Sequence, residues 1–169
     1  MSDTLLLPAV AQALAAHGVA HEVLECSPEL ADTAEFCEHY GFSLEQAANT
    51  ILVASKKVEP ARYAVCVVLG TTRLDVNRSV RALLGVKRAS FADAGTTTAL
   101  TGMLVGGVTV PGIVGLPVYV DRAVMDVPRV VMGGGNRSSK IVLDPAELRK
   151  LPGVEVMDGL ATPREPAEA

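Results

Sequence analysis

Residues 101–112 read TGMLVGGVTVPG, and the four glycines of this stretch decide how the rest of the chain is interpreted. A glycine inside a helix or strand costs roughly 0.5–1 kcal/mol relative to alanine, so a contact that offsets this cost is expected. Gly106 and Gly107 stand among apolar residues, which predicts a buried strand interrupted where a ligand or another backbone comes close. A tight β-turn between two buried strands is the alternative, and the pattern alone leaves both open.

The 169 residues fit one domain with a substantial core, which must be aliphatic because the chain has no Trp and only three Tyr and three Phe. No apolar run reaches the roughly 18 residues of a membrane-spanning helix. The apolar segment LLLPAVAQALAA near the start follows no basic residue, which argues against a signal peptide. We therefore expect no membrane association and a cytoplasmic location.

The cysteines and histidines lack the spacing of metal ligands or of a disulfide framework. There are three of each, with no CxxC or HExxH pattern. We therefore predict no metal site and interpret the cysteines as small buried hydrophobic residues. The six residues are Cys26, Cys37, Cys66, His17, His21 and His39.

Charge is distributed unevenly along the chain. The net charge is −4, yet residues 56–88 hold eight basic and two acidic residues, a local charge of plus six, whereas residues 1–55 hold eight acids and no Lys or Arg. This asymmetry favours a local anionic partner over a non-specific coat of nucleic acid. A solvated helix face with turn lysines is the alternative. The basic residues are Lys56, Lys57, Arg62, Arg73, Arg78, Arg81, Lys87 and Arg88.

Hydrophobic periodicity, caps and turn residues predict a chain of alternating helices and strands. An amphipathic helix capped by Asp75 and ended by Gly85 has the clearest pattern, and the β-branched runs 50–54 and 63–69 predict an antiparallel pair covered on both faces. Asp144, Pro145 and Glu147 read as a capping box that begins a last helix. Further helices are predicted from Asp3 or Thr4 to Gly18, over 31–40 and over 92–100, and further strands over 19–26, 87–91, 116–120, 129–132 and 141–143.

A second glycine segment, GGGNRSSK at 133–140, is a poor match to GxGxxG and leads into a strand. It therefore predicts no dinucleotide site, because the pyrophosphate needs a helix N-terminus, and it lacks the GK[ST] ending of a P-loop. Two interpretations stay open. The amides of this loop, with Asn136, Arg137 and Ser138, hold a phosphate or ribose, or the loop is a plain turn between strands.

The order of these motifs is more specific than any one of them. A TILV strand, a VxLG-ended strand, a basic helix with LLG, TGxLVGG, a VYVD strand, GGGxR and DPxxL follow one another over residues 41–160. In this the chain resembles the YbaK family, the aminoacyl-tRNA deacylase domain also found in or beside prolyl-tRNA synthetases. The resemblance implies one α/β (mixed α+β) domain over 1–160, with a curved mixed sheet flanked by helices. Residues 161–169 are predicted to be a disordered tail.

The resemblance also implies a site without a cofactor. Its partner is the acceptor end of an aminoacyl-tRNA, and an aminoacyl-tRNA synthetase is a candidate second partner. Ester hydrolysis builds negative charge on the carbonyl oxygen, which the N–H groups of Gly106 and Gly107 are expected to stabilise. Around them we expect a substrate site, and the basic segment is expected to meet tRNA phosphates. The substrate residues are Thr101, Gly102, Gly133, Gly134, Asn136 and Arg137, and the tRNA-binding residues are Arg73, Arg78 and Arg81.

The chain departs from the family pattern at the residue before the TILV strand. Family deacylases carry a lysine there, whereas this chain has Asn49. Asn49 is uncharged but can still donate hydrogen bonds, and on the deacylase interpretation it is expected to take part in catalysis as a donor. Lys56 and Lys57 are too far away to replace the family lysine, because seven or eight residues of extended strand span roughly 23–26 Å. Pro111 one residue late and Gly133 in place of a larger residue indicate a reshaped acyl pocket. A module that binds an aminoacyl-tRNA end or a synthetase without hydrolysis, and a divergent protein on the same scaffold, therefore remain alternatives.

Overall fold

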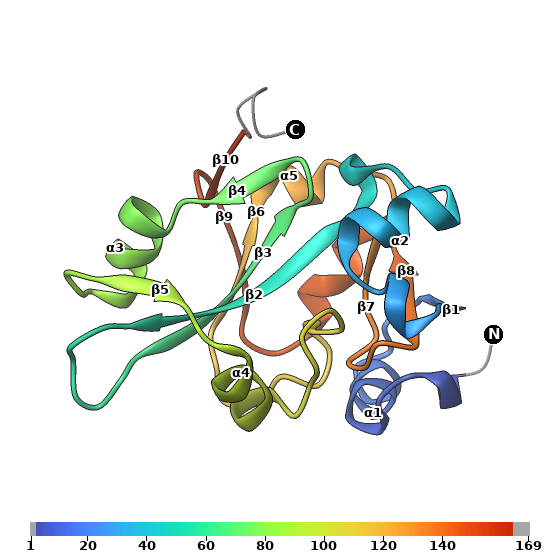
Figure 1. The fold of residues 1–169 in the computed structure, drawn as a ribbon, viewed down its shortest axis with the longest axis horizontal. Helices are drawn as coiled ribbons and strands as arrows, with labels where there is room; N and C mark the ends of the chain where they lie inside the picture. Colours follow the sequence, from blue (N-terminus) through green and yellow to red (C-terminus); the bar gives the residue numbers. More distant parts are fainter. Residues whose placement is uncertain (1–2, 164–169) are drawn as a thin grey trace.

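The computed structural model describes residues 3–163, and a five-stranded mixed sheet lies at its centre (Figure 1). The order of its strands is β5-β2-β3-β6-β9. The long hairpin β2 and β3 is antiparallel, as predicted, whereas β6 and β9 run parallel to β3. The strands are β2 (Ala48–Ser55), β3 (Tyr63–Leu69), β5 (Ala89–Phe91), β6 (Val118–Asp121) and β9 (Val154–Met157).

A smaller antiparallel sheet, in the order β1-β8-β7, packs against the large one. A parallel bridge between Ala47 and Val131 joins the two where β2 begins. A third, two-stranded sheet pairs β4 with β10. The bounds are β1 (Glu22–Glu25), β7 (Val130–Gly133), β8 (Ser139–Leu143), β4 (Thr72–Leu74) and β10 (Ala161–Pro163).

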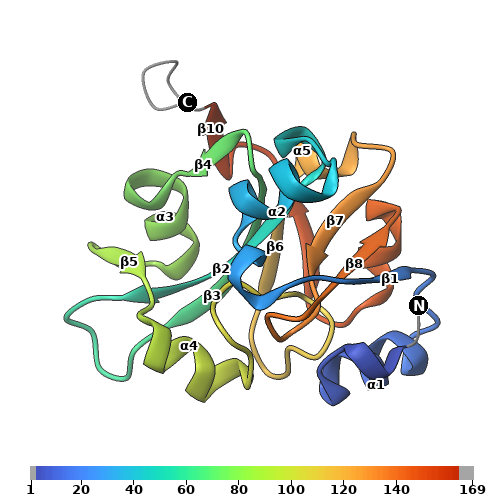
Figure 2. The same ribbon diagram turned by 45° about the vertical axis from the view of Figure 1, so that its right-hand side comes forward.

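Helices cover the outside of these sheets, with α3 and α1 on opposite sides of the molecule (Figure 2). A π-helical segment, η4, runs directly into α3 and ends at Gly85, where φ is 66°. The predicted amphipathic helix after Asp75 is therefore confirmed as a continuous helical segment. The helices are η1 (Asp3–Leu5), α1 (Pro8–Ala16), η2 (Pro28–Leu30), α2 (Thr33–Tyr40), η3 (Leu44–Gln46), η4 (Val76–Val80), α3 (Arg81–Leu84), α4 (Ala94–Thr101), α5 (Arg122–Met125) and η5 (Pro145–Lys150).

The alternation of side chains along β3 explains how both faces of the large sheet are buried. Cys66 and its even-numbered neighbours pack beneath α3 and Leu160, whereas Val65 and Val67 belong to the main core shared with α1, β7 and β8. This is why the sequence of β3 is a continuous apolar run. Burial also raises the pKa of the Cys66 thiol to about 12. All three cysteines are free and buried, as predicted.

The prediction of a broken strand in residues 101–112 is wrong. After α4 ends at Gly102 the chain continues as irregular loop and turn. Leu104 and Val105 are half-exposed, at 50% and 51%, whereas Gly107 is buried. The apolar residues around the glycine pair had suggested a strand, but only some of them, such as Met103 and Val110, are buried, together with the backbone of Gly107.

Two predictions near the C-terminal end also need correction. Asp144 caps η5 by accepting from the Ala146 N–H, but Glu147 does not close a capping box. Its carboxylate instead accepts from the Ala20 N–H at 2.6 Å and from Lys150 at 2.8 Å. The predicted disordered tail is wrong for residues 161–163, which pair with β4, and 164–169 lie outside the described residues. Within residues 3–163, no helix is long and apolar enough to cross a membrane.

Candidate functional site

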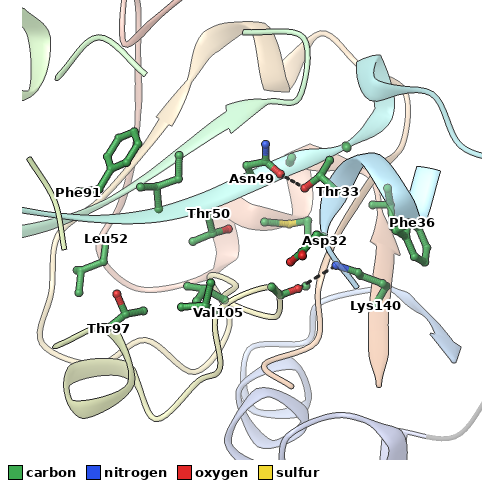
Figure 3. A pocket seen from close by; sticks show the side chains of 18 of the residues that line it. Asp32, Thr33, Phe36, Asn49, Thr50, Leu52, Phe91, Thr97, Val105 and Lys140 are labelled. Carbon is green, nitrogen blue, oxygen red and sulfur yellow. Dashed lines mark hydrogen bonds between the residues drawn. The ribbon is translucent and has the colours of Figure 1, made fainter. Parts of the chain in front are cut away.

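A cavity of about 390 Å³ opens between β2, α2 and the loop that follows α4 (Figure 3). Most of its wall is apolar, and its charged lining residues are Asp32 and Lys140. A concave, largely apolar site with a few polar groups is typical of small-ligand binding. The lining residues are Asp32, Thr33, Phe36, Cys37, Ala47, Ala48, Asn49, Thr50, Ile51, Leu52, Phe91, Ala92, Thr97, Val105, Gly106, Val108, Val131, Met132, Gly133 and Lys140.

The two glycine segments build one end of this cavity by packing backbone against backbone. The Gly135 N–H donates to the Gly107 carbonyl at 2.7 Å, and the Leu104 N–H donates to the Gly135 carbonyl at 3.1 Å. A Cβ on Gly107 would lie 2.0 Å from the carbonyl oxygen of Asn136, and one on Gly133 would lie 2.4 Å from the carbonyl oxygen of Gly107. Neither position has room for a side chain. The close approach expected at the first glycine pair is therefore made, at Gly107, by another backbone.

Gly106 and Gly107 differ in what their amides can do. The Gly107 N–H donates to the Leu104 carbonyl at 2.8 Å, and Gly107 does not line the cavity. The expected pair of oxyanion donors is thus corrected to one candidate. Gly106 lines the cavity with φ of 92°, and its N–H has no acceptor among residues 3–163.

Lys140 on β8 is the functional candidate that the sequence did not single out. Its buried ammonium donates to the Ala31 carbonyl at 2.6 Å and to the Gly106 carbonyl at 3.1 Å, and it lies 5.3 Å from the centre of the Phe36 ring. Desolvation lowers the pKa of this lysine below its ordinary value. The available signal was a lysine inside a strand whose other residues are all apolar or small, because buried lysines are rare without a specific partner.

Asn49, on β2, lies in the cavity wall. Its side-chain oxygen accepts from the Thr33 hydroxyl of α2 at 2.5 Å. Beside it, the buried hydroxyl of Thr50 has no hydrogen-bond partner among the described residues. A buried polar atom without a partner costs about 1–3 kcal/mol, so the Thr50 hydroxyl is a candidate contact for a ligand.

Arg137 and Asn136 support the site from outside the cavity lining. The Arg137 guanidinium donates to the Pro28 carbonyl at 2.8 and 3.1 Å, to the Val105 carbonyl at 2.9 Å and to Asp32 at 3.0 Å. The Asn136 amide donates to the Leu5 carbonyl, and its oxygen accepts from Ser138 and Ser139. Both side chains thus make hydrogen bonds to other residues of the protein. Neither side chain lines the cavity, and their contact with a substrate stays a prediction.

The other predicted site residues separate into two groups. Asn49, Gly106 and Gly133 line the cavity, whereas Thr101, Gly102 and Gly134 do not. The Thr101 hydroxyl donates to the Thr97 carbonyl, and Gly102 ends α4 in the left-handed conformation. A Cβ on Gly134 would lie 2.1 Å from the Ser139 hydroxyl. These three residues shape the loops around the site.

The predicted tRNA-binding arginines also separate. Arg81 lines a second hollow, of about 270 Å³, near the start of β5, whereas Arg73 and Arg78 do not. Among residues 3–163, no three His, Cys, Asp or Glu side chains gather as a metal site would require.

The family model of the aminoacyl-tRNA editing domain matches residues 27–151. This range contains every lining residue of the cavity and both glycine segments. The chain belongs to the aminoacyl-tRNA editing domain family. This match confirms the resemblance to YbaK-type proteins. The similar solved structures described next confirm the mixed α/β single-domain fold.

Solved structures similar to this editing domain share most of its length. A proposed trans-editing enzyme for prolyl-tRNA synthetase is 26% identical over 94% of this chain and 97% of its own, with a TM-score of 0.76. A hypothetical protein is 25% identical over 90% and 99%, with a TM-score of 0.79. A structure from a study that grafted epitopes onto scaffold proteins is 27% identical over 89% and 94%, with a TM-score of 0.76.

Proposed function

We propose that this editing domain is an aminoacyl-tRNA deacylase, which hydrolyses the ester between a wrongly attached amino acid and its tRNA. The observation that carries the proposal is at Gly106, a cavity-lining residue whose N–H has no acceptor among residues 3–163 and whose carbonyl accepts from the buried ammonium of Lys140 at 3.1 Å. An N–H donor beside a fixed positive charge is suited to the negative charge that ester hydrolysis creates.

In the proposed reaction the oxygen of a water molecule adds to the ester carbonyl carbon. The carbonyl oxygen becomes negatively charged and accepts from the Gly106 N–H, a type of contact worth about 2.7–4 kcal/mol in the transition state. The bond from that carbon to the ribose oxygen then breaks, and the proton lost by the water ends on the ribose oxygen. The products are a free amino acid and an uncharged tRNA.

In this proposal the Lys140 ammonium supplies the positive charge that, in the family deacylases, comes from the lysine before the TILV strand. Its ammonium comes from β8, on a different wall of the cavity from Asn49 on β2. Because its surroundings are desolvated, its charge acts at a lower effective dielectric constant than it would at the surface. Asn49, held by Thr33, supplies hydrogen bonds where relatives supply charge.

The lining also supports an amino-acid substrate with a small side chain. The Asp32 carboxylate is the acidic group of the lining and is suited to accept from an α-ammonium group. Leu52, Val105 and Val108 offer an apolar surface for the side chain. The Thr50 hydroxyl, which has no partner among the described residues, would then hydrogen-bond to the ester or to a polar side chain.

A binding module that recognises an aminoacyl-tRNA end, or a synthetase, without hydrolysis is the second candidate. Asn49 favours it, because a neutral amide stands where active relatives carry an ammonium. On this alternative Lys140 serves only to hold the loops around Ala31 and Gly106.

Incubation of the purified protein with a panel of aminoacyl-tRNAs, with and without prolyl-tRNA synthetase, tests the proposal. We expect at least one ester to disappear faster than in buffer. If no ester is lost above the buffer rate, the deacylase is excluded. Binding of a tRNA whose amino acid is attached through a stable amide then decides whether the binding module remains.

A further inference from the structure

The second hollow gathers four cationic side chains at one end of the large sheet. It lies where the end of β2, the start of β5 and the helical segment η4–α3 meet, and the Lys56 N–H donates to the Arg88 carbonyl at 2.9 Å. No Asp or Glu lines this hollow, and within residues 3–163 none of its four cations takes part in an ion pair. The lining residues are Lys56, Asn77, Arg81, Lys87, Arg88 and Ala89.

Four like charges around one hollow repel one another, so an anion at this place would be bound favourably. Some cations elsewhere in the described residues are paired with acids. Arg122 meets Asp158 at 2.6 Å, and Arg129 meets Glu22 at 3.2 Å. The acidic N-terminal third of the chain sends no carboxylate into the hollow. The arrangement therefore indicates a partner from outside the protein that carries phosphate or carboxylate groups.

Strand β5 connects this hollow to the cavity. Ala89, its first residue, lines the hollow, and Phe91, its last, lines the cavity. Two residues of extended strand span about 7 Å. The Phe91 side chain is 58% exposed, and Figure 3 shows it at the opposite side of the cavity from Lys140. A solvent-exposed aromatic ring thus stands between a cationic hollow and the cavity.

We propose that β5 and the hollow form a binding track for a single-stranded RNA 3′ end. Phe91 stacks on a base next to the cavity, and Lys56, Arg81, Lys87 and Arg88 bind phosphates upstream of it. Cations that follow the backbone together with an aromatic ring that stacks a base are the combination by which proteins hold single strands. An acidic peptide would bind the cations, but it would offer no base to stack on the exposed Phe91 ring.

The proposal rests on the proposed function for one point, namely that the 3′ terminus enters the cavity. It also narrows the expected tRNA contacts. Of the three arginines that the sequence suggested, Arg81 belongs to the track, whereas Arg73 on β4 and Arg78 lie outside the hollow.

The test measures binding of a short, fluorescein-labelled single-stranded RNA that ends in CCA and carries no amino acid, by fluorescence anisotropy at several salt concentrations. The double variant Lys87→Gln/Arg88→Gln should bind at least about tenfold more weakly and lose about 0.7 from the log–log salt slope for each phosphate contact removed. Phe91→Ala should weaken binding at least about fivefold, and Phe91→Tyr should restore it, because it keeps a ring for stacking. The matched control, Arg129→Gln/Arg149→Gln, removes the same charge elsewhere and should bind like the parent protein.

Equal weakening in the control pair, unchanged binding in Lys87→Gln/Arg88→Gln, or preference for duplex RNA over the single strand would overturn the track. Because the probe has no ester, its binding does not depend on hydrolysis. A protein that binds the probe as expected but hydrolyses no aminoacyl-tRNA would overturn the proposed function alone. A protein that hydrolyses its substrate with no dependence on these residues would overturn the track alone.

Discussion

The ammonium of Lys140 lies 3.1 Å from the carbonyl oxygen of Gly106, and the two residues come from different segments of the chain. Their contact joins β8 to the turn over residues 104–107, here called the glycine turn, which the bond from the Gly107 N–H to the Leu104 carbonyl closes. The Gly106 carbonyl is therefore held by the charge, while its N–H has no acceptor among residues 3–163. The Gly106 N–H itself belongs to the preceding peptide unit, whose carbonyl, that of Val105, accepts from Arg137 at 2.9 Å.

Replacing Lys140 with Met tests whether this charge contributes to hydrolysis. Met keeps a long unbranched side chain but removes the ammonium and its bonds to the Ala31 and Gly106 carbonyls. We expect the single-turnover rate to fall at least about tenfold, because a charge near the developing oxyanion is lost. Leaving buried carbonyls unpaired should also lower the free energy of unfolding by about 1–3 kcal/mol, measured by urea denaturation. A stable Lys140→Met protein with the parent rate would remove Lys140 from the mechanism.

The pH dependence gives a second measure of the same group. Desolvation lowers the pKa of Lys140 from its ordinary 10.5, so the ammonium is lost at a lower pH than for a surface lysine. The rate above the buffer background should decline as pH rises through this lowered pKa, and Lys140→Arg should lack the decline. For stability the sign is opposite. Between the lowered pKa and 10.5 the unfolded chain holds more protons, so the free energy of unfolding contributed by this group rises with pH. A rate decline that is identical in Lys140→Arg would assign it to another group.

Asn49→Lys places a second ammonium in the cavity wall and removes the bond from Thr33. We expect a change in rate or in the preferred amino acid, measured across the aminoacyl-tRNA panel. Thr33→Val is the matched control, because it breaks the same hydrogen bond without adding charge. If both variants behave like the parent protein, Asn49 does not act in the site.

Gly133→Ala should damage the site through the backbone. The new Cβ would lie 2.4 Å from the carbonyl oxygen of Gly107, so the glycine turn must move. We expect a loss of about 1–3 kcal/mol in the free energy of unfolding, as for other overpacked sites, together with reduced deacylation. Gly95→Ala is the control, because its Cβ would meet the Asp93 side chain at an ordinary 3.5 Å. Equal stability of the two variants would contradict the close packing of the two glycine segments.

Much of the fold could be predicted because its signals are local. The run 63–69 matches β3 residue for residue, and Gly85 ends the helical segment as expected. The strand prediction for residues 101–112 was wrong because apolar residues next to a buried glycine resemble a strand, and only the backbone of Asn136 explains why Gly107 is a glycine. This partner is distant in sequence, so no local pattern reveals it.

The site was predicted less completely for the same reason. Asn49, Gly106 and Gly133 could be located by their motifs. Lys140 was missed although a lysine in an apolar strand was a signal, because its contact with Ala31 joins segments that are distant in sequence. Arg137 was expected to contact the substrate, whereas its guanidinium N–H groups donate to the carbonyls of Pro28 and Val105.

The backbone-on-backbone contact of Gly107 with Gly133 and Asn136 limits how this site can evolve. Since Gly107 and Gly133 have no room for a side chain, changes there alter the whole turn rather than one contact. Selectivity can instead change by single substitutions on the opposite walls, where Leu52, Thr97 and Val105 project side chains toward the cavity (Figure 3). Relatives with different substrates are therefore expected to keep the glycine turn and to vary these three positions.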